Sequence, residues 1–272
     1  MSPGPISVRA LCLLGIAGVC GVASCEPTVV VGQWNCVEPD ASTASDADWL
    51  PWWTGFESQT CDYLRVGGFC YADGGGSHHT VTAPVHSGNY AEAFSVTAQG
   101  IRNQSQVRCV RQGTLPGAAY YGAWYYLPSN ATSSGLWNLF HFQGASTPNG
   151  IAHGLWDVSL VTGANGKLHA RVLNFLYTGA AGGNAVEASI PVPIGSWFHF
   201  EFFLKRAKDR TGEVDLYQDG VRVARFTKVV TDDTNWGQWF VGNLVDTLNP
   251  PESTVYVDDV TIAATLGWTP PQ

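Results

Sequence analysis

Residues 197–205 read Trp-Phe-His-Phe-Glu-Phe-Phe-Leu-Lys, and this stretch is the clearest indication of the fold. Every second residue is large and apolar, in the order Phe198, Phe200, Phe202 and Leu204. Side chains alternate between the two faces of a β-strand, so these four lie on one face. Such a face is stable only when a second layer covers it, which indicates a strand in a packed β-sandwich.

Turn signals along the rest of the chain point to the same architecture. An Asp-Gly pair at residues 219–220 and an Asn-Gly pair at residues 165–166 each join two strand-like runs, as in tight β-hairpins. Another turn signal, Asp-Gly-Gly-Gly, occupies residues 73–76. Almost no segment shows the 3.6-residue period of an amphipathic helix. We therefore expect an all-β fold with many short strands, a sandwich or a jelly roll.

The composition is typical of a β-protein that binds sugars. Of 272 residues, only 13% are charged, while 31 are glycine and 11 are tryptophan. So many tryptophans exceed the needs of the core, and a flat ring stacks well on the apolar face of a pyranose. The net charge of −8 argues against nucleic acid as the main partner. We expect a monomer whose partner is a polysaccharide.

The N-terminus resembles a bacterial export signal. Arg9 precedes an apolar stretch, residues 10–23, that is too short to span a bilayer. Residues 22–25, Val-Ala-Ser-Cys, resemble the lipobox, in which a cysteine is lipidated and becomes the new N-terminus. This resemblance implies a lipid on Cys25. The alternative is an ordinary secretory signal that is cut near Ser24.

The same segment suggests how the chain is organised and where it resides. We predict a signal peptide at residues 1–24, a tether at residues 25–48 and one β-jelly-roll domain at residues 49–272. Glu26 follows the cysteine, and in lipoproteins a residue other than Asp at this place implies sorting to the outer membrane. The protein is thus expected in the bacterial cell envelope, held to the membrane by its N-terminal lipid alone.

Four cysteines remain after the signal and the lipid site, at positions Cys36, Cys61, Cys70 and Cys109. An even number in an oxidising compartment implies two disulfides, for which three connectivities exist. We take sequential pairing, 36 with 61 and 70 with 109, as the working hypothesis. A zinc site is disfavoured because the spacings contain no Cys-x-x-Cys pair.

Several segments, taken in order, carry a family resemblance. They are Gly-Phe-Glu-Ser (55–58), Pro-Val-His-Ser-Gly-Asn-Tyr-Ala (84–91), Tyr-Gly-Ala-Trp-Tyr-Tyr-Leu-Pro (121–128), Trp-Asn-Leu-Phe-His-Phe-Gln-Gly (137–144), Gly-Ser-Trp-Phe-His-Phe (195–200), Asp-Leu-Tyr-Gln-Asp-Gly (215–220) and Val-Tyr-Val-Asp-Asp-Val (255–260). Together they resemble the concanavalin A-like jelly roll of lectins, glucanases and polysaccharide lyases. Their order and spacing are similar to the heparin-lyase-like and glucuronan-lyase-like branch. The resemblance implies a sandwich of two antiparallel sheets, and it leaves the chemistry open.

Two acidic residues are candidates for a structural calcium site. By strict alternation, Asp258 shares a strand face with Val260 and Ile262, and a carboxylate among apolar side chains needs a partner or a metal. Related jelly rolls hold calcium with acids of this kind, which makes Glu57 the second candidate ligand. The alternative is that both carboxylates accept hydrogen bonds from backbone amides or are exposed.

Two predicted strands present polar residues that suggest a sugar groove. Strict alternation places Trp137, His141 and Gln143 on one face, and His169 and Arg171 on one face of a later strand. If both faces line the concave sheet, these side chains converge, with rings for stacking and polar groups for hydroxyls or a carboxylate. Further candidates for this groove are Arg108, Tyr125 and Trp156. The alternative places these residues on the solvated convex face.

A uronate lyase must neutralise the substrate carboxylate, remove the C5 proton and protonate the leaving oxygen. The resemblance assigns neutralisation to Gln143 or Arg108 and proton transfer to His141. Lyases of this fold often carry Gln-x-His, and this chain has the reverse order at residues 141–143. The strand that supplies a tyrosine in alginate-type lyases has none here, so Tyr121 or Tyr125 is the candidate replacement.

Other functions have less support in the sequence. Glucanases of this fold place their acids in a Glu-x-Asp-x-x-Glu run, and none occurs. We therefore expect an exported lipoprotein that binds a polysaccharide in a concave groove and is a candidate for cleaving it by β-elimination. The alternative is a non-catalytic surface protein that binds another protein or has a structural role.

Overall fold

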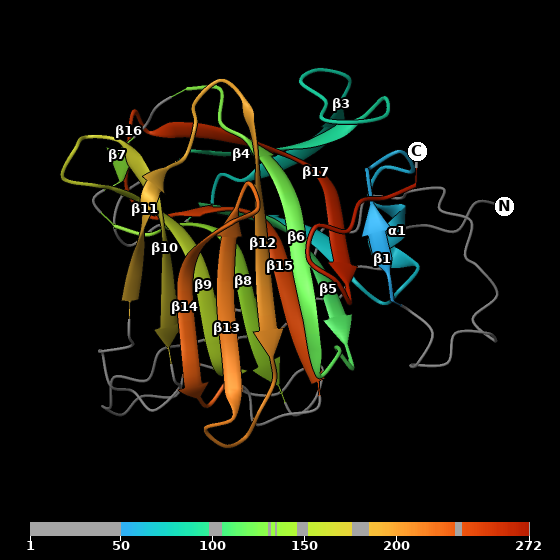
Figure 1. The fold of residues 1–272 in the computed structure, drawn as a ribbon. Coiled ribbons are helices and arrows are strands. Elements are labelled where there is room, and N and C mark those ends of the chain that lie inside the picture. The colour runs from blue at the N-terminus through green and yellow to red at the C-terminus, as the bar shows by residue number, and fades with distance from the viewer. Residues whose placement is uncertain are drawn as a thin grey trace, which may run out of the picture.

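The computed structural model describes residues 50–97, 105–129, 132–133, 135–145, 152–175, 185–231 and 236–271. In these residues the chain forms two large antiparallel sheets that pack face to face (Figure 1). This is the all-β jelly-roll sandwich that the sequence predicts. The candidate lipid site Cys25, the predicted signal and the tether lie outside the described residues. No helix in the described part is long and apolar enough to cross a membrane.

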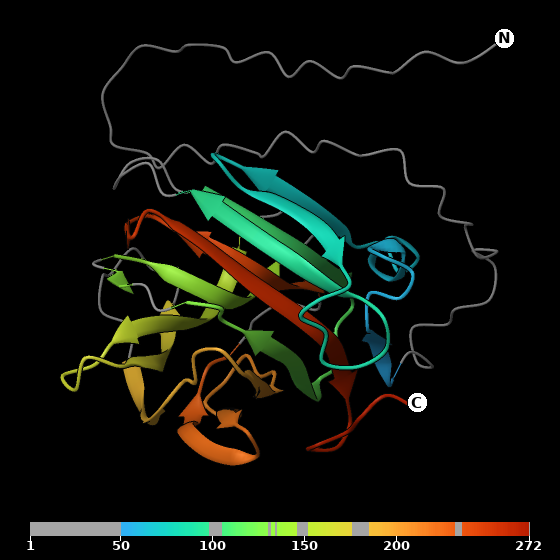
Figure 2. The same cartoon turned by 90° about the horizontal axis from the view of Figure 1, so that it is seen from above.

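Sheet A is the layer that contains the phenylalanine-rich strand. Its strands are, in spatial order, β14 (Val221–Val229), β13 (Gly212–Gln218), β12 (Trp197–Lys205), β6 (Ala118–Tyr126), β17 (Glu252–Ala263), β4 (Ala91–Thr97) and β3 (Ser77–Val81), with β1 (Trp52–Thr54) also paired to β17. Figure 2 shows the long strand β17, in red, crossing the molecule between β4 and β6.

Sheet B is the second layer. Its strands are, in spatial order, β11 (Ala185–Pro191), β10 (Leu168–Phe175), β9 (Ala152–Thr162), β8 (Trp137–Ala145), β15 (Trp236–Val245), β5 (Ser105–Gly113) and β2 (Phe69–Asp73). A short pair, β7 (Thr132–Ser133) with β16 (Leu248–Asn249), and one helical turn, α1 (Cys61–Leu64), complete the described elements.

The core lies between the sheets and is rich in aromatic rings. The four apolar residues of β12 point into it, since none exceeds 1% exposure. Phe202 of sheet A packs on Phe140 of sheet B, with ring centroids 4.7 Å apart. Both predicted hairpins form, the β13–β14 turn at residues 219–220 and the β9–β10 turn at residues 165–166. Asp219 and Gly220 have φ of +50° and +77°, which explains why this turn needs Asp-Gly.

One predicted disulfide is confirmed, and it joins two neighbouring strands. Cys70 of β2 is bonded to Cys109 of β5, directly opposite each other with Cα atoms 4.0 Å apart. Cys61 is also disulfide-bonded, and its predicted partner, Cys36, lies outside the described residues. The Cys70–Cys109 bond attaches the edge strand β2 to sheet B.

Replacing both Cys70 and Cys109 with serine is expected to destabilise the domain. The bond closes a loop with a sequence separation of 39, so its loss frees the unfolded chain and costs about 2–5 kcal/mol. Urea unfolding of the double variant measures this change. An unaltered free energy of unfolding would show that β2 needs no covalent attachment.

His199 gives the stability of the fold a pH dependence. Its ring lies on the outer face of sheet A and stacks on Trp124, with centroids 5.1 Å apart. Burial, together with the nearby His86, lowers the pKa of His199 to about 4. An unfolded histidine takes up a proton below pH ~6.5, whereas the folded one stays neutral until about pH 4. His199 therefore favours the unfolded state increasingly as the pH falls through this window.

The variant His199→Gln is expected to lose less stability than the wild type between pH 6.5 and pH 4. Glutamine is neutral throughout, so the wild type should lose up to about 3 kcal/mol more than the variant on acidification. The difference between the two urea-unfolding curves therefore reports His199 together with its interaction with His86. Parallel pH profiles would contradict this assignment.

Candidate functional site

A cluster of polar side chains lies on the outer face of sheet B, away from the core. A row of paired residues across three strands shows which face this is. His141 of β8 lies opposite Phe240 of β15, and Phe240 lies opposite Val110 of β5. Directly opposite residues on antiparallel strands project from the same face of a sheet. His141 and its neighbours in the row are therefore presented together on this face.

His141 is held between a carboxylate and an amide. Nδ1 of His141 lies 2.7 Å from Oδ1 of Asp157 on β9, an ion-pair contact whose angles fall short of a hydrogen bond. Nε2 lies 3.1 Å from Oε1 of Gln143, and Gln143 donates in turn to Gln238 of β15. The edge of the imidazole meets the Phe240 ring at 4.8 Å. These contacts fix the orientation of the imidazole, which suits a group that transfers protons.

Arg108 of β5 is a buried cation on the same face. It is 5% exposed, its Nη2 donates a 2.7 Å hydrogen bond to Oδ1 of Asn138, and its guanidinium lies 5.4 Å from the centroid of the Phe240 ring. In the part of the chain that the structure describes, no carboxylate pairs with it. A buried charge without a counter-ion is costly, which favours a ligand that brings a negative group.

A glycine opens the path between Arg108 and Asn138. The two residues come from β5 and β8, and β15 runs between them with Gly242 opposite Arg108. Gly242 has φ of +147°, a conformation that favours glycine, and the β15–β8 register shifts at this point. With no side chain on β15, the guanidinium can reach across to the amide.

Tyr71 of β2 lies directly opposite Arg108. It is 6% exposed, and its hydroxyl donates to Oε1 of Gln106 at 3.1 Å. Burial raises the pKa of Tyr71, and the positive charge of Arg108 opposes this shift. The phenol is therefore protonated at neutral pH. The adjacent Cys70–Cys109 disulfide fixes the register that places Tyr71 beside Arg108.

Arg171 of β10 extends the cluster in the other direction. It lies opposite Ser159 of β9, which in turn lies opposite Asn138. Nε of Arg171 and Oγ of Ser159 are buried and have no hydrogen-bond partner among the described residues. Unpaired buried donors are unusual in folded proteins, so these two groups are further candidates for contact with a ligand.

The other predicted groove residues are either enclosed or in the core. His169 faces outward from sheet B, as Arg171 does, because Leu168 and Ala170 face the core. His169 is 5% exposed, and both ring nitrogens already have partners, the carbonyl of Ala188 at 2.8 Å and Oδ1 of Asn165 at 3.1 Å. Trp137, Trp156 and Tyr125 have no exposed surface and belong to the core. The prediction that these three contact substrate is wrong, and Tyr121, also in the core, is excluded as the acid or base.

A β-bulge explains the error at Trp137. The pairing of β8 with β9 shifts between Asn138 and Phe140, so strict alternation fails in β8. Trp137 consequently points into the core, where its indole nitrogen donates to Asn243, while His141 and Gln143 face outward. The same shift brings Asn138 to the outer face beside Arg108. Strict alternation had placed Asn138 and His141 on different faces of the strand.

The candidate calcium ligands are engaged with backbone amides. Oε1 of Glu57 accepts hydrogen bonds from the N–H groups of Asn89 and Tyr90. Oδ2 of Asp258 accepts from the N–H groups of His86 and Ser87. Burial raises the pKa of Asp258 to about 7, the adjacent Asp259 adds to the shift, and the amide hydrogen bonds oppose it. This is the amide-bonded alternative considered above for the two carboxylates.

A second bulge accounts for the position of Asp258. The pairing of β17 with β6 shifts between Asp258 and Thr261, and Asp259 has φ of +45°. Val260 and Ile262 therefore point into the core while Asp258 does not share their face, so strict alternation was wrong here too. Among the described residues, no group of three or more His, Cys, Asp or Glu could hold a metal ion. The calcium ion predicted at Glu57 and Asp258 stays a prediction.

Solved structures of similar fold include two polysaccharide lyases and a cellulose induced protein. An endo-β-1,4-glucuronan lyase from the fungus Trichoderma reesei aligns with a TM-score of 0.56 and 19% identity, over 72% of this chain and 90% of its own. The cellulose induced protein Cip1 aligns with a TM-score of 0.53 and 16% identity, over 78% and 97%. The PL-14 alginate lyase from Aplysia kurodai gives 0.52 and 11%, over 71% and 87%. At these identities the likeness establishes the fold.

The sequence itself establishes the family. A search of curated protein sequences gives no match. The polysaccharide lyase family model, however, matches residues 45–261, which is most of the chain. The match includes every strand of the two sheets, except for the last two residues of β17. The chain belongs to the polysaccharide lyase family.

Proposed function

We propose that this protein cleaves a uronate-containing polysaccharide by β-elimination on the outer face of sheet B. The observation that carries the proposal is Arg108, a cation that is 95% buried and that no described carboxylate neutralises. A uronate carboxylate would complete its coordination. Arg171, with its unpaired Nε, adds a second positive charge to the same face.

The chemistry requires three roles, and this face offers a group for each. Arg108, aided by Asn138 or Gln143, neutralises the uronate carboxylate, which makes the C5 proton more acidic. His141, oriented by Asp157, removes that proton with Nε2, which must first leave its contact with Gln143. The C4–C5 double bond forms as the C4–O bond breaks, and a protonated side chain gives its proton to the leaving oxygen. Tyr71 is the candidate donor, because its phenol is protonated and lies beside Arg108.

Hydrolysis has less support on this face. A glycosidase needs two carboxyl groups that flank the scissile bond, one of them free to act as an acid. The carboxylate described within the cluster, Asp157, is engaged with His141. A binding protein without catalysis is the remaining alternative, and the same residues would then serve recognition only.

The direct test is a substrate panel. The purified full chain would be incubated with alginate, glucuronan, heparin-like and neutral polysaccharides while the ultraviolet absorbance of unsaturated uronate products is followed. We expect a rise with one uronate polymer and none with the neutral ones. A flat trace over the whole panel, from folded protein, would contradict lyase activity on these substrates and favour the binding protein.

The cellular location is part of the proposal and rests on the N-terminal sequence alone. We propose that Cys25 carries lipid and anchors the protein in the bacterial cell envelope. Radiolabelled palmitate fed to expressing cells should label the wild type and should not label Cys25→Ala. Equal labelling of the two proteins would contradict the anchor.

A further inference from the structure

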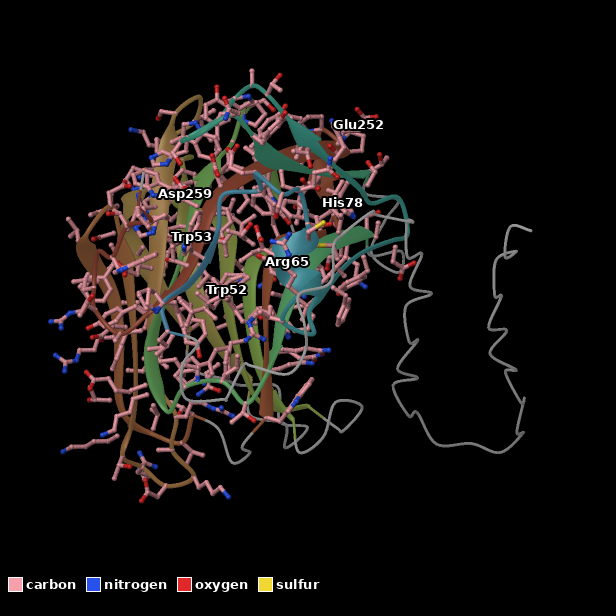
Figure 3. All side chains as sticks on the ribbon, turned by 90° about the vertical axis from the view of Figure 1, so that its right-hand side faces the viewer. Trp52, Trp53, Arg65, His78, Glu252 and Asp259 are labelled. Carbon is pink, nitrogen blue, oxygen red and sulfur yellow. A yellow bond between two sulfur atoms is a disulfide. The ribbon has the colours of Figure 1, made fainter. Side chains whose placement is uncertain are left out.

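A cleft of about 1190 Å³ lies on the outer face of sheet A, on the opposite side of the sandwich from Arg108 and His141. Strands β6, β12 and β17 form its floor. Its walls are residues near β1, the loop at residues 86–89 and the C-terminal segment at residues 266–271. In Figure 3, Trp53 and Asp259, which both line the cleft, lie close together, and Gly55 lies against both of their side chains.

The hollow arises where a row of aromatic rings is interrupted. Along β6, Tyr120, Trp124 and Tyr126 each pack on rings of neighbouring strands. Gly122 interrupts this series, opposite Glu201 of β12 and Thr261 of β17. Because Gly122 has no side chain, the face of the sheet is hollow down to its backbone. The cleft therefore has aromatic rings beside a polar floor.

The floor presents hydrogen-bonding groups at fixed positions. A Cβ atom at position 122 would lie 2.8 Å from Oγ1 of Thr261 and 2.9 Å from Nε2 of His199, so both polar tips lie over the glycine. Glu201 is held by the N–H of Gly267, which donates to Oε1 at 2.9 Å and Oε2 at 3.1 Å. This contact also fixes the C-terminal segment that carries Trp268.

The charge of the cleft disfavours an anionic ligand. Its lining contains the carboxylates Glu57, Glu201, Asp219 and Asp259 and no lysine or arginine. His199 is neutral at pH 7, because burial lowers its pKa to about 4. A uronate polymer would be repelled here, whereas carboxylates and flat rings together are the groups that hold sugar hydroxyls and pyranose faces.

We infer that this cleft is a second glycan-binding site, which takes an uncharged oligosaccharide and does not take the uronate polymer. The tryptophans Trp53 and Trp268 stack on the sugar rings, and the carboxylates and Thr261 bind the hydroxyls. The protein itself already donates to the carboxylates of the floor, Gly267 to Glu201 and His86 and Ser87 to Asp259. An acyl chain would offer the remaining polar groups no hydrogen bond, which disfavours it as the occupant. The site is independent of the lyase proposal, because it shares no residue with the cluster on sheet B.

Isothermal titration of the full chain with cellohexaose, xylohexaose and mannohexaose tests this site. We expect at least one of them to bind. Trp53 is 39% exposed and Trp268 lies after the last strand, so the double variant Trp53→Ala/Trp268→Ala should fold and should bind roughly tenfold more weakly or worse. The single variant Trp268→Ala should show part of this loss.

Two control variants separate this site from the other face. Tyr90 has the same 39% exposure as Trp53 and does not line the cleft, so Tyr90→Ala should bind like the wild type. Arg108→Ala should also bind normally, since it alters only the sheet B cluster. The inference is overturned if folded wild type binds none of the three hexasaccharides, or if Arg108→Ala abolishes binding while the tryptophan variants retain it. Lyase activity on uronate polymers is measured separately and does not enter this result.

Discussion

Replacing Arg108 with alanine is expected to lower kcat/KM for the cleaved uronate polymer by about 10²- to 10³-fold, because the variant loses the cation that neutralises the substrate carboxylate. The loss should be large since this cation is buried and has no competing carboxylate among the described residues. The initial rate of unsaturated product formation measures the effect. Arg108→Lys should recover part of the activity, because it keeps the charge but not the planar pair of donors.

A matched control comes from the other sheet. Arg222 of β14 has a side chain that is 46% exposed and lies away from this cluster, so Arg222→Ala should leave the rate unchanged. The fold of each variant is checked by its urea-unfolding midpoint. If Arg108→Ala retains wild-type activity, the carboxylate does not bind at this residue, and Arg171 becomes the next cation to test.

His141→Ala is expected to lower kcat by about 10²- to 10⁴-fold, the range for removal of a group that transfers a proton in the transition state. Asp157→Asn should give a smaller loss, because the imidazole remains but its charged partner is gone. KM should change little in both variants if these residues act on the transition state more than on substrate binding. Steady-state kinetics on the polymer found in the panel separates the two parameters.

The control for His141 is an exposed histidine on another sheet. His79 of β3 lies on the solvent side of sheet A, and His79→Ala should behave like the wild type. Tyr71→Phe adds a further test of the site, since it removes only the hydroxyl. Wild-type kcat in His141→Ala would contradict the proposed role of this histidine, whatever the result at Tyr71.

The fold could be predicted because its main signals are local. Alternation in β12 is uninterrupted, so its apolar residues identify the core face directly. The Asp-Gly and Asn-Gly hairpins depend on backbone conformations that a few residues determine. The pairing of Cys70 with Cys109 was a hypothesis among three connectivities, and the structure confirms it because β2 and β5 are neighbours.

The site was predicted only in part, and the bulges explain why. Arg108, His141, Gln143 and Arg171 do lie on the outer face of sheet B, as expected if the polar faces of their strands share a sheet. Trp137 was misplaced by the bulge in β8. Trp156 and Tyr125 were offered as candidates without a pattern that fixed their face, and both are in the core. Tyr71 and Asp157 were missed, because a single tyrosine or aspartate in a strand carries no local signal of its partners.

The sequence by itself determined the all-β class, the core face of β12, the tight hairpins and the polar character of the strands that carry His141 and Arg171. Only the tertiary structure decided which of these strands are neighbours and where a bulge exchanges the two faces. A bulge inserts one residue and reverses the direction of every side chain beyond it. Its free-energy cost depends on contacts between strands that are distant in sequence, so the local pattern does not reveal it. The counter-ion that Arg108 lacks and the hollow over Gly122 are therefore properties of the assembled sheets.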